Sequence, residues 1–150
     1  MKERALTITE FMTGAHKACD EQFARAEAAA GEWSRVATDF AAFRGGLEQH
    51  LAMEDDVLFP AFEDATGMSE GGPSQTMRAE HVQMRALLEQ LGDAIASRDE
   101  DAYLGLADTL LVLMQQHNLK EEGMMYPMLD AALADRVDEL LAGCRALEAA

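Results

Sequence analysis

The chain has 150 residues, 49% of them apolar, which is enough for one compact domain with a buried core, so we expect a single domain over residues 1–150. Its 28 acidic and 12 basic residues give a formal net charge of -16, which argues against nucleic acid or an anionic membrane as partner, because phosphate binding depends on clustered Lys and Arg. The N-terminal residues lack an apolar signal core and no stretch approaches about 18 consecutive apolar residues, so we expect a cytoplasmic protein.

Apolar residues recur at spacings of three and four along most of the chain, which predicts helices. A first helix lies around His16 and ends before Gly31; its apolar residues are Ile8, Met12, Cys19 and Phe23. A second helix begins at Trp33. Its apolar stripe includes His50 and Glu54, which places this polar pair on the buried face; the other members are Val36, Phe40, Phe43, Leu47, Val57 and Ala61.

The longest loop is predicted between Gly67 and Ser74, because glycine and proline cluster there. A third helix follows around His81, with the apolar residues Met77, Met84, Leu88, Leu91 and Ile95, and a break at 97–101 ends it. A fourth helix repeats the second, with His117 and Glu121 in an apolar stripe of Tyr103, Leu106, Leu110, Leu113, Met124 and Met128.

Two prolines should interrupt the second and fourth helices. Pro60 and Pro127 have no amide proton for the helical hydrogen bond, so each helix should kink or stop shortly after its His and Glu pair. A last amphipathic segment carries Leu133, Val137, Leu140, Leu141 and Leu147. The prediction is an all-α protein, an up-down-up-down four-helix bundle with a short C-terminal helix that caps the bundle or forms a dimer contact, so the protein is a monomer or homodimer.

All four histidines belong to a duplicated pattern. His50 and Glu54 are followed by Phe59-Pro60, and His117 and Glu121 by Tyr126-Pro127, while His16 and His81 lie at nearly equal distances upstream. Residues four apart project from the same face of a helix, so each pair can chelate a metal ion. An isolated pair is more often a hydrogen-bonded pair on a helix surface than a metal site, but the duplication predicts a dinuclear metal site.

Charge and ligand type limit which metal ions the site could bind. Two buried carboxylates facing each other repel unless cations neutralise them. Two divalent ions would leave a positive centre that favours a hydroxide or oxide bridge. Mixed imidazole and carboxylate ligands suit iron, zinc or manganese, and iron is the first choice. Ferritin-like bundles use four Glu and two His, so a set of four His and two Glu indicates a different class.

On these residues the chain resembles the hemerythrin-like (HHE cation-binding) domain family over residues 5–130. The resemblance implies a non-haem di-iron centre with six protein ligands: His16 and His50 on one iron, His81 and His117 on the other, and Glu54 and Glu121 bridging both. The oxygen carriers of that family have a fifth histidine one turn after the position of His81. Arg85 stands there in this chain, which argues against simple oxygen carriage.

The expected site is nearly symmetric, with an open position on each iron for a small molecule; Asp20 is the most plausible additional ligand. The leading hypothesis for function is binding or sensing of oxygen, nitric oxide or peroxide. A redox enzyme or an iron-sulfur repair factor using the same centre is the alternative, as is a metal buffer without a redox role. Whether the protein is an enzyme stays open.

Neighbouring residues receive ordinary roles. Cys19 is expected to be a small buried hydrophobe, with a place next to the metal ligands as the alternative, and Glu80 is expected to be solvated. Asp20 and Arg85 occupy equivalent positions in the two halves, where they are partly exposed charges or, alternatively, orient ligands or pair with each other. Tyr126 is expected to pack in the core, because its counterpart is Phe59; the alternative is that it donates a hydrogen bond or an electron near the site.

Overall fold

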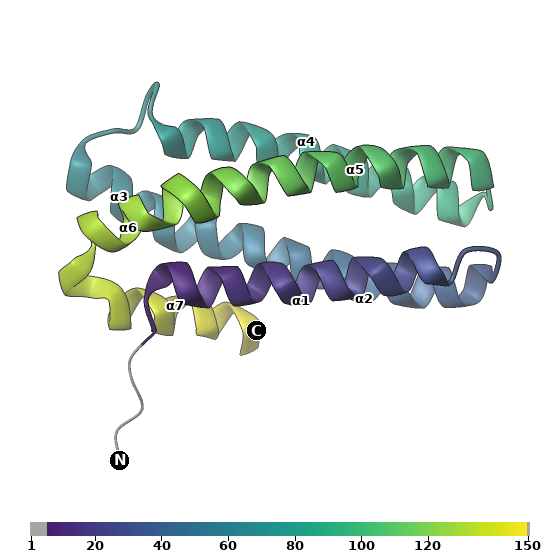
Figure 1. The fold of residues 1–150 in the computed structure, drawn as a ribbon, viewed down its shortest axis with the longest axis horizontal. Helices are drawn as coiled ribbons and strands as arrows, with labels where there is room; N and C mark the ends of the chain where they lie inside the picture. The colour runs from purple at the N-terminus through teal and green to yellow at the C-terminus, as the bar shows by residue number, and fades with distance from the viewer. Residues whose placement is uncertain (1–5, 150) are drawn as a thin grey trace, which may run out of the picture.

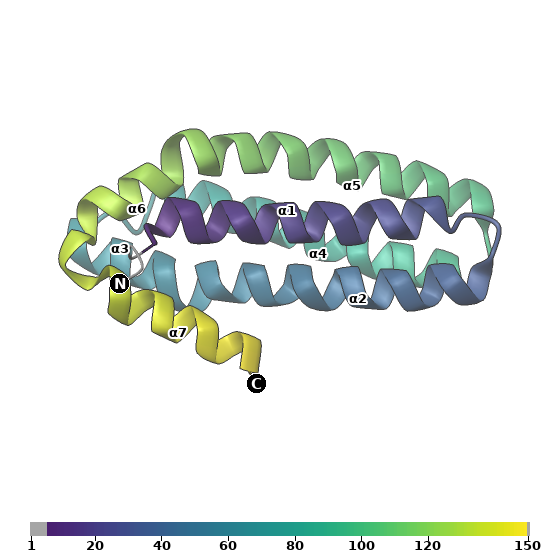
Figure 2. The same cartoon turned by 60° about the horizontal axis from the view of Figure 1, so that its bottom comes forward.

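The computed structural model describes residues 6–149, so residues 1–5 and 150 of the expected domain lie outside it. Within that range every regular element is helical, which confirms the all-α prediction. Figures 1 and 2 show four long helices side by side: α1 (Ile8–Ala28), α2 (Trp33–Ala52), α4 (Pro73–Ala96) and α5 (Glu100–Lys120). The shorter elements gather at one end: η1 (Met53–Leu58), α3 (Phe59–Thr66), η2 (Glu121–Met125), α6 (Tyr126–Ala132), η3 (Ala134–Arg136) and α7 (Val137–Ala149).

Helix ends fall where the sequence places its breaks. Thr7 and Glu10 form a capping box at the start of α1, and Asp99 caps the first turn of α5. Pro73 occupies the first position of α4, where its missing amide proton costs nothing. Gly67 ends α3 with a φ of 72°, a left-handed conformation that glycine adopts without a steric penalty.

The chain stays helical at both prolines. A π-helical segment precedes each proline, and the next α-helix, α3 or α6, begins one residue before it. The amide of Phe59 donates to the carbonyl of Glu54, and that of Tyr126 donates to Glu121, five residues back in each case. Pro60 has no proton to donate to the preceding turn, and the Asp55 carbonyl accepts from Arg78 Nη1 at 3.1 Å instead. Such π segments are frequent at functional sites.

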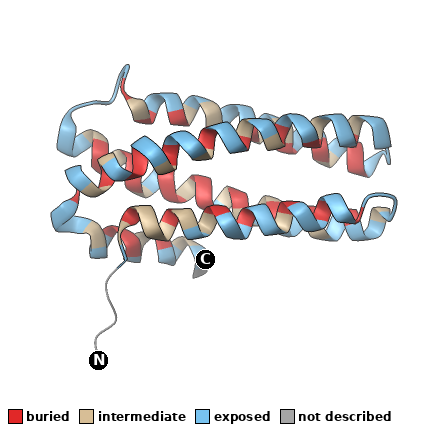
Figure 3. Ribbon diagram, viewed as in Figure 1, coloured by how far each residue is buried: buried red, intermediate tan, exposed pale blue. Residues whose placement is uncertain are grey.

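The core is divided into two apolar clusters with a polar layer between them, and Figure 3 shows the buried residues on the faces that the helices turn toward one another. On α1, Ile8 and Met12 belong to one cluster and Cys19 and Phe23 to the other, with His16 between them. On α4, His81 similarly separates Met77 from Met84. Each long helix therefore crosses the polar layer once.

The buried face of the fourth helix differs from the predicted stripe. Leu106 and Leu113 are only partly buried, and Met124 is 44% exposed. The residues that are buried in their place are Ala107, Met114 and Met125. Bulky apolar residues lie on several sides of α5, so hydrophobicity does not define its inner face, and the wider π turn moves the buried methionine one position along the chain.

The C-terminal helix α7 packs beside α1, α2 and η1, burying Leu140, Leu141 and Cys144. A second long-range connection reaches the first turn of α1. The carboxylate of Asp130, in α6, accepts hydrogen bonds from the amides of Ile8 and Thr9 at 2.8 and 3.0 Å. Among residues 6–149 no helix is both long and apolar enough to span a membrane.

The Asp130 contacts predict a measurable stability loss. Asp130→Ala leaves two half-buried amides at the start of α1 without their charged acceptor, so we expect the free energy of unfolding to fall by about 1–3 kcal/mol. Urea denaturation of the metal-free protein measures this. Glu70→Ala, in the exposed mid-chain loop, is the control and should change stability by less than about 0.5 kcal/mol. Equal stabilities of the two variants would contradict the assignment.

Candidate metal centre

The six side chains singled out by the duplicated motif converge in the polar layer, and all are buried. They form two groups whose potential ligand atoms lie within 4.8 Å of one another. One group consists of His16, His50, Glu54 and Glu121, and the other of Glu54, His81, His117 and Glu121. Because Glu54 and Glu121 belong to both groups, each carboxylate faces histidines from both halves of the chain.

Helix geometry explains the convergence. His50 lies in the last turn of α2 and Glu54 in η1, while His117 and Glu121 occupy the corresponding positions in α5 and η2. The π turns begin where the two carboxylates must enter the layer. His81 Nε2 lies 2.9 Å from Glu54 Oε1, and His117 Nε2 lies 3.1 Å from Glu121 Oε1.

Tyr126 is fully buried, as expected, and its hydroxyl also reaches the centre, as the alternative of a hydrogen bond near the site required. Its hydroxyl donates to Glu54 Oε2 at 2.5 Å and lies 2.9 Å from Glu121 Oε1. It also lies 2.9 Å from His16 Nε2 and 3.3 Å from His50 Nε2, so it contacts all four residues of the first group. In the other half, Phe59 stacks on His81 and offers no hydroxyl. The surroundings of the two groups are therefore less symmetric than predicted.

Three acidic residues hold histidines from outside. The carboxylates of Glu122, Asp55 and Glu80 accept from the Nδ1 atoms of His16, His81 and His117 at 2.7, 2.8 and 2.7 Å. Such contacts fix which imidazole nitrogen faces inward, as they do around metal-bound histidines. The expectation that Glu80 is solvated is wrong, because its side chain is only 16% exposed and lies between α4, which carries it, and His117 and Lys120 of α5.

Two of these outer acids, Glu80 and Asp55, pair with basic side chains. Lys120 pairs with Glu80, and Arg85 lies 3.0 Å from Asp55 and 3.4 Å from Glu48. Arg85 therefore pairs with Asp55 and not with Asp20. Burial alone would raise the pKa values of both acids. Hydrogen bonds with His81 and Arg85 lower the pKa of Asp55, and hydrogen bonds with Lys120 and His117 lower that of Glu80, so both acids remain charged acceptors.

Burial and the carboxylates of Glu54 and Glu121 shift the pKa of His50 in opposite directions. Burial lowers the pKa of His50, but the charge of Glu54 and hydrogen bonds with Glu121 and Glu54 outweigh it and raise this pKa to about 10. His81 is raised to about 9 against burial by Asp55 and Glu54. Burial alone would raise the pKa of Glu121, but hydrogen bonds with Glu54 and the histidines keep it well below its usual range. Without metal, protons on the histidines compensate the carboxylates.

The residues fit a metal pair. Among the residues described, Glu121 Oε2 is buried without a hydrogen-bond partner. His81 Nε2 lies near Glu54 Oε1, and His117 Nε2 near Glu121 Oε1, at 2.9 and 3.1 Å, but neither contact has the geometry of a hydrogen bond. Buried polar atoms are normally paired, so unpaired nitrogen and oxygen atoms facing one another indicate a cation between them. The donor set of imidazoles and carboxylates is one that binds iron, zinc or manganese.

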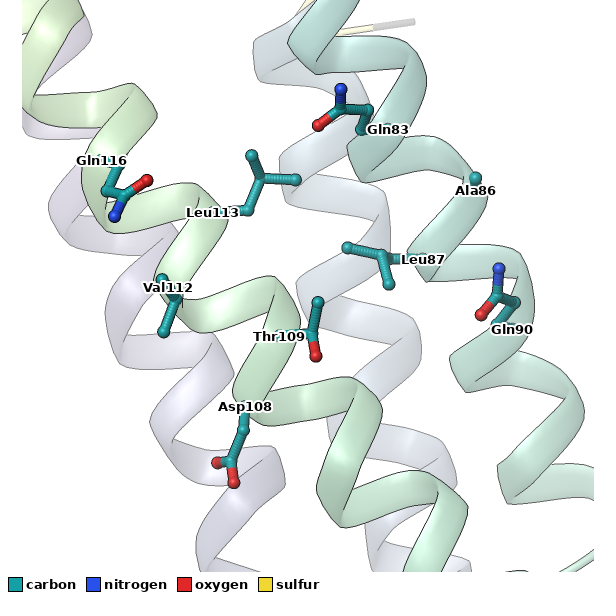
Figure 4. A pocket seen from close by; sticks show the side chains of 9 residues that line it. All are labelled: Gln83, Ala86, Leu87, Gln90, Asp108, Thr109, Val112, Leu113 and Gln116. Atoms are coloured by element: carbon teal, nitrogen blue, oxygen red, sulfur yellow. The ribbon is translucent and has the colours of Figure 1, made fainter.

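Asp20 and Cys19 stay outside both groups. Burial raises the pKa of the Cys19 thiol to about 11, so it remains protonated and serves as a buried apolar side chain. A hollow of about 710 Å³ lies apart from the centre, between α4 and α5 (Figure 4). In Figure 4, Leu87 and Leu113 point into the space between these helices, and none of its lining residues belongs to the two groups.

Comparison with protein families gives one match: the model of the hemerythrin HHE cation-binding domain matches residues 7–129. The matched range contains all six converging residues. Neither the curated proteins nor the solved structures gave a match to the chain.

The histidine pKa values predict how the stability of the metal-free protein depends on pH. The folded-state pKa values of His50 and His81 exceed the usual 6.5, so the contribution of these two residues to stability is complete below pH 6.5 and is lost as pH rises through about 9 and 10. The contribution of Glu121 is complete above pH 4.5 and is lost on acidification. We expect maximal stability between these limits, measured by urea denaturation in the presence of a chelator. Stability that rises between pH 7 and 10 would contradict the assignment.

Tyr126→Phe tests the hydroxyl. The substitution leaves Glu54 Oε2 buried without this donor, so we expect the metal-free protein to lose about 1–3 kcal/mol of unfolding free energy. The control is Tyr103→Phe, which removes a single neutral hydrogen bond to the Ala26 carbonyl and should cost about 1 kcal/mol. Metal binding should reduce the first loss and leave the second unchanged. A Tyr126→Phe protein as stable as wild type would show that the hydroxyl is not needed.

Proposed function

The chain belongs to the hemerythrin HHE cation-binding domain family, and from this membership we propose that it is a non-haem di-iron protein that binds or senses a small molecule. The observation that carries the proposal is the sharing of Glu54 and Glu121 between two buried ligand groups. Carboxylates common to both groups could serve as ligands to an ion in each group. The molecule bound would be oxygen, nitric oxide or peroxide.

Within this proposal, His16 and His50 hold one ion, and His81 and His117 hold the other. A bound iron pair supplies two-electron redox chemistry toward a small molecule. The protein contributes orientation and exclusion of water. Glu122, Asp55 and Glu80 hold their histidines with Nε2 inward, and apolar clusters lie on both sides of the layer.

Tyr126 has a separate role in the proposal. Burial, together with the charges of Glu54 and Glu121, raises its pKa well above the usual value, so the hydroxyl keeps its proton at neutral pH. It can therefore donate a hydrogen bond beside the His16 and His50 group, which the other half, with Phe59, cannot do.

We further propose that the four long helices form an up-down-up-down bundle and that residues 1–150 are one cytoplasmic domain. The protein would act as a monomer or homodimer, without nucleic acid or membrane as partner. The net charge of -16 supports the exclusion of anionic partners, since like charges repel.

Anaerobic loading with ferrous iron, followed by rapid mixing, tests the function. We expect two irons per chain by metal analysis. Mixing the reduced protein with oxygen, nitric oxide or peroxide should change the near-ultraviolet and visible absorption within one turnover. A reduced, iron-loaded protein that reacts with none of the three would contradict the proposal.

Variants and outcomes separate the alternatives. His117→Ala and His50→Ala each remove one ligand and should lower iron stoichiometry below two, whereas Gln115→Ala, an exposed neighbour on α5, should retain two. Repeated turnover of peroxide or nitric oxide would make the protein a redox enzyme, and transfer of iron to a damaged iron-sulfur protein would make it a repair factor. Preferential, readily exchanged zinc would favour a metal buffer.

A further inference from the structure

The outward side of α4 and α5 carries few charges for a chain that is rich in acids. Between Asp108 and Lys120, α5 contains no Asp, Glu, Lys or Arg. On α4, Arg85 and Glu89 pair with residues of α2 and η1, so these charges lie on the side of α4 that faces α2. We call the nearly uncharged surface the α4–α5 face; it is formed by Gln83, Ala86 and Gln90 of α4 and by the exposed residues among 104–119 of α5.

Large apolar side chains are exposed on this face. On α5, Leu104, Val112 and Leu119 are 44%, 52% and 73% exposed. Among the residues described, neither α1 nor α2 exposes a large apolar side chain. A helix that is apolar on all sides is normally covered, so the solvent-facing side of α5 indicates a contact with another molecule.

A hollow and a row of protruding side chains lie next to each other on the face. The hollow, about 710 Å³ in volume, lies over Leu87 and Leu113, which point into the space between α4 and α5 (Figure 4). Val112 lines its edge, and the helical spacing places Leu104 and Leu119 on the same side of α5 as Val112. A ridge beside a hollow is self-complementary, because around a twofold axis the ridge of one copy can enter the hollow of the other.

We propose that the chain forms a homodimer in which the α4–α5 faces of two copies pack around a twofold axis. Three polar side chains that line the hollow are amides: Gln83, Gln90 and Gln116. An amide has both donors and an acceptor, so it can pair with the same group of a second copy, which two carboxylates or two ammonium groups cannot do.

The charge of the chain favours the same occupant. A net charge of -16 makes most other contacts between two copies repulsive, whereas Asp108 is the one charged residue that lines this hollow. A basic protein is the partner that the net charge would otherwise attract, and it would find almost no carboxylates on this face. The proposal thus selects the homodimer from the two oligomeric states named above and assigns its surface.

The size of the face sets the expected strength of the dimer. Leu104 and Leu119 lie about 22 Å apart along the helix axis, and two helices side by side are about 20 Å wide. Such a face lies at the low end of specific interfaces, which bury roughly 800 Å² per partner in the standard case. We therefore expect a dimer that dissociates on dilution into the micromolar range.

Sedimentation velocity of the full chain, both metal-free and loaded with zinc, tests the proposal. We expect a monomer–dimer equilibrium between micromolar and several hundred micromolar protein. Sodium chloride should strengthen the dimer, because salt screens the repulsion between two chains of charge -16. A protein that stays monomeric over this range at high salt would overturn the proposal and leave the face to a different protein. A dimer that salt weakens would depend on ion pairs and would also overturn it.

Charge-matched variants locate the interface. Ala86→Glu places a carboxylate at the hollow and should weaken the dimer at least tenfold, whereas Ala42→Glu makes the same change at an exposed position of α2 and should weaken it less than twofold. Asp108→Asn should tighten the dimer severalfold, and Glu21→Gln, which removes the same charge from an exposed position of α1, should have a smaller effect. Equal dimerisation of the two alanine variants, with folding checked by circular dichroism, would overturn the proposal.

Methyl NMR of the unsubstituted chain locates the contact even if a variant fails to fold. Raising the protein concentration should shift the methyl signals of Leu87, Val112 and Leu113, while those of Val36, which is buried in α2, should stay unchanged. Shifts confined to another helix, such as α7, would overturn the assignment of the face. Neither measurement uses iron, so a negative result here is distinct from a failure of the proposed function.

Discussion

Burial of two carboxylates is the constraint on which the rest of this structure depends. Glu54 and Glu121 are fully buried between two apolar clusters, where an uncompensated negative charge would cost several kcal/mol. The surrounding groups stabilise these buried charges. Four histidines face the carboxylates, the Tyr126 hydroxyl donates to them, and a shell of outer acids and bases keeps the imidazoles oriented. Protons or metal cations then complete the charge balance.

The two glutamates lie in π-helical segments that precede prolines. A continuous α-helix from Trp33 would meet Pro60 without a donor for the preceding turn, and the π segment resolves this one turn after His50. The same solution recurs at Glu121 and Pro127. A π segment ahead of a proline and a carboxylate in the polar layer therefore occur together in both halves.

The sequence predicts the helices, the breaks and the convergence of the six polar residues, because these follow from periodicity and from a motif present twice. It does not predict the inner face of α5, where leucines lie on several sides and the π turn shifts the register. Comparing Tyr126 with Phe59 favoured packing in the core over a hydrogen bond near the site, but equivalent positions need not have equivalent roles. The outer acids had a usable signal: Asp55 and Glu122 each follow a central glutamate directly, although their partners lie on other helices and only tertiary structure reveals them.

The loop between α3 and α4, exposed at residues 67–71, divides the six converging residues evenly, with His16, His50 and Glu54 before it and His81, His117 and Glu121 after it. Neither ligand group is complete in one portion, because each takes three residues from one side of the loop and a single glutamate from the other. A peptide bond cut in this loop would yield two fragments that can assemble either ligand group only by associating with each other. Because each portion contributes one glutamate to the other portion's group, the centre connects the N-terminal and C-terminal portions of the chain.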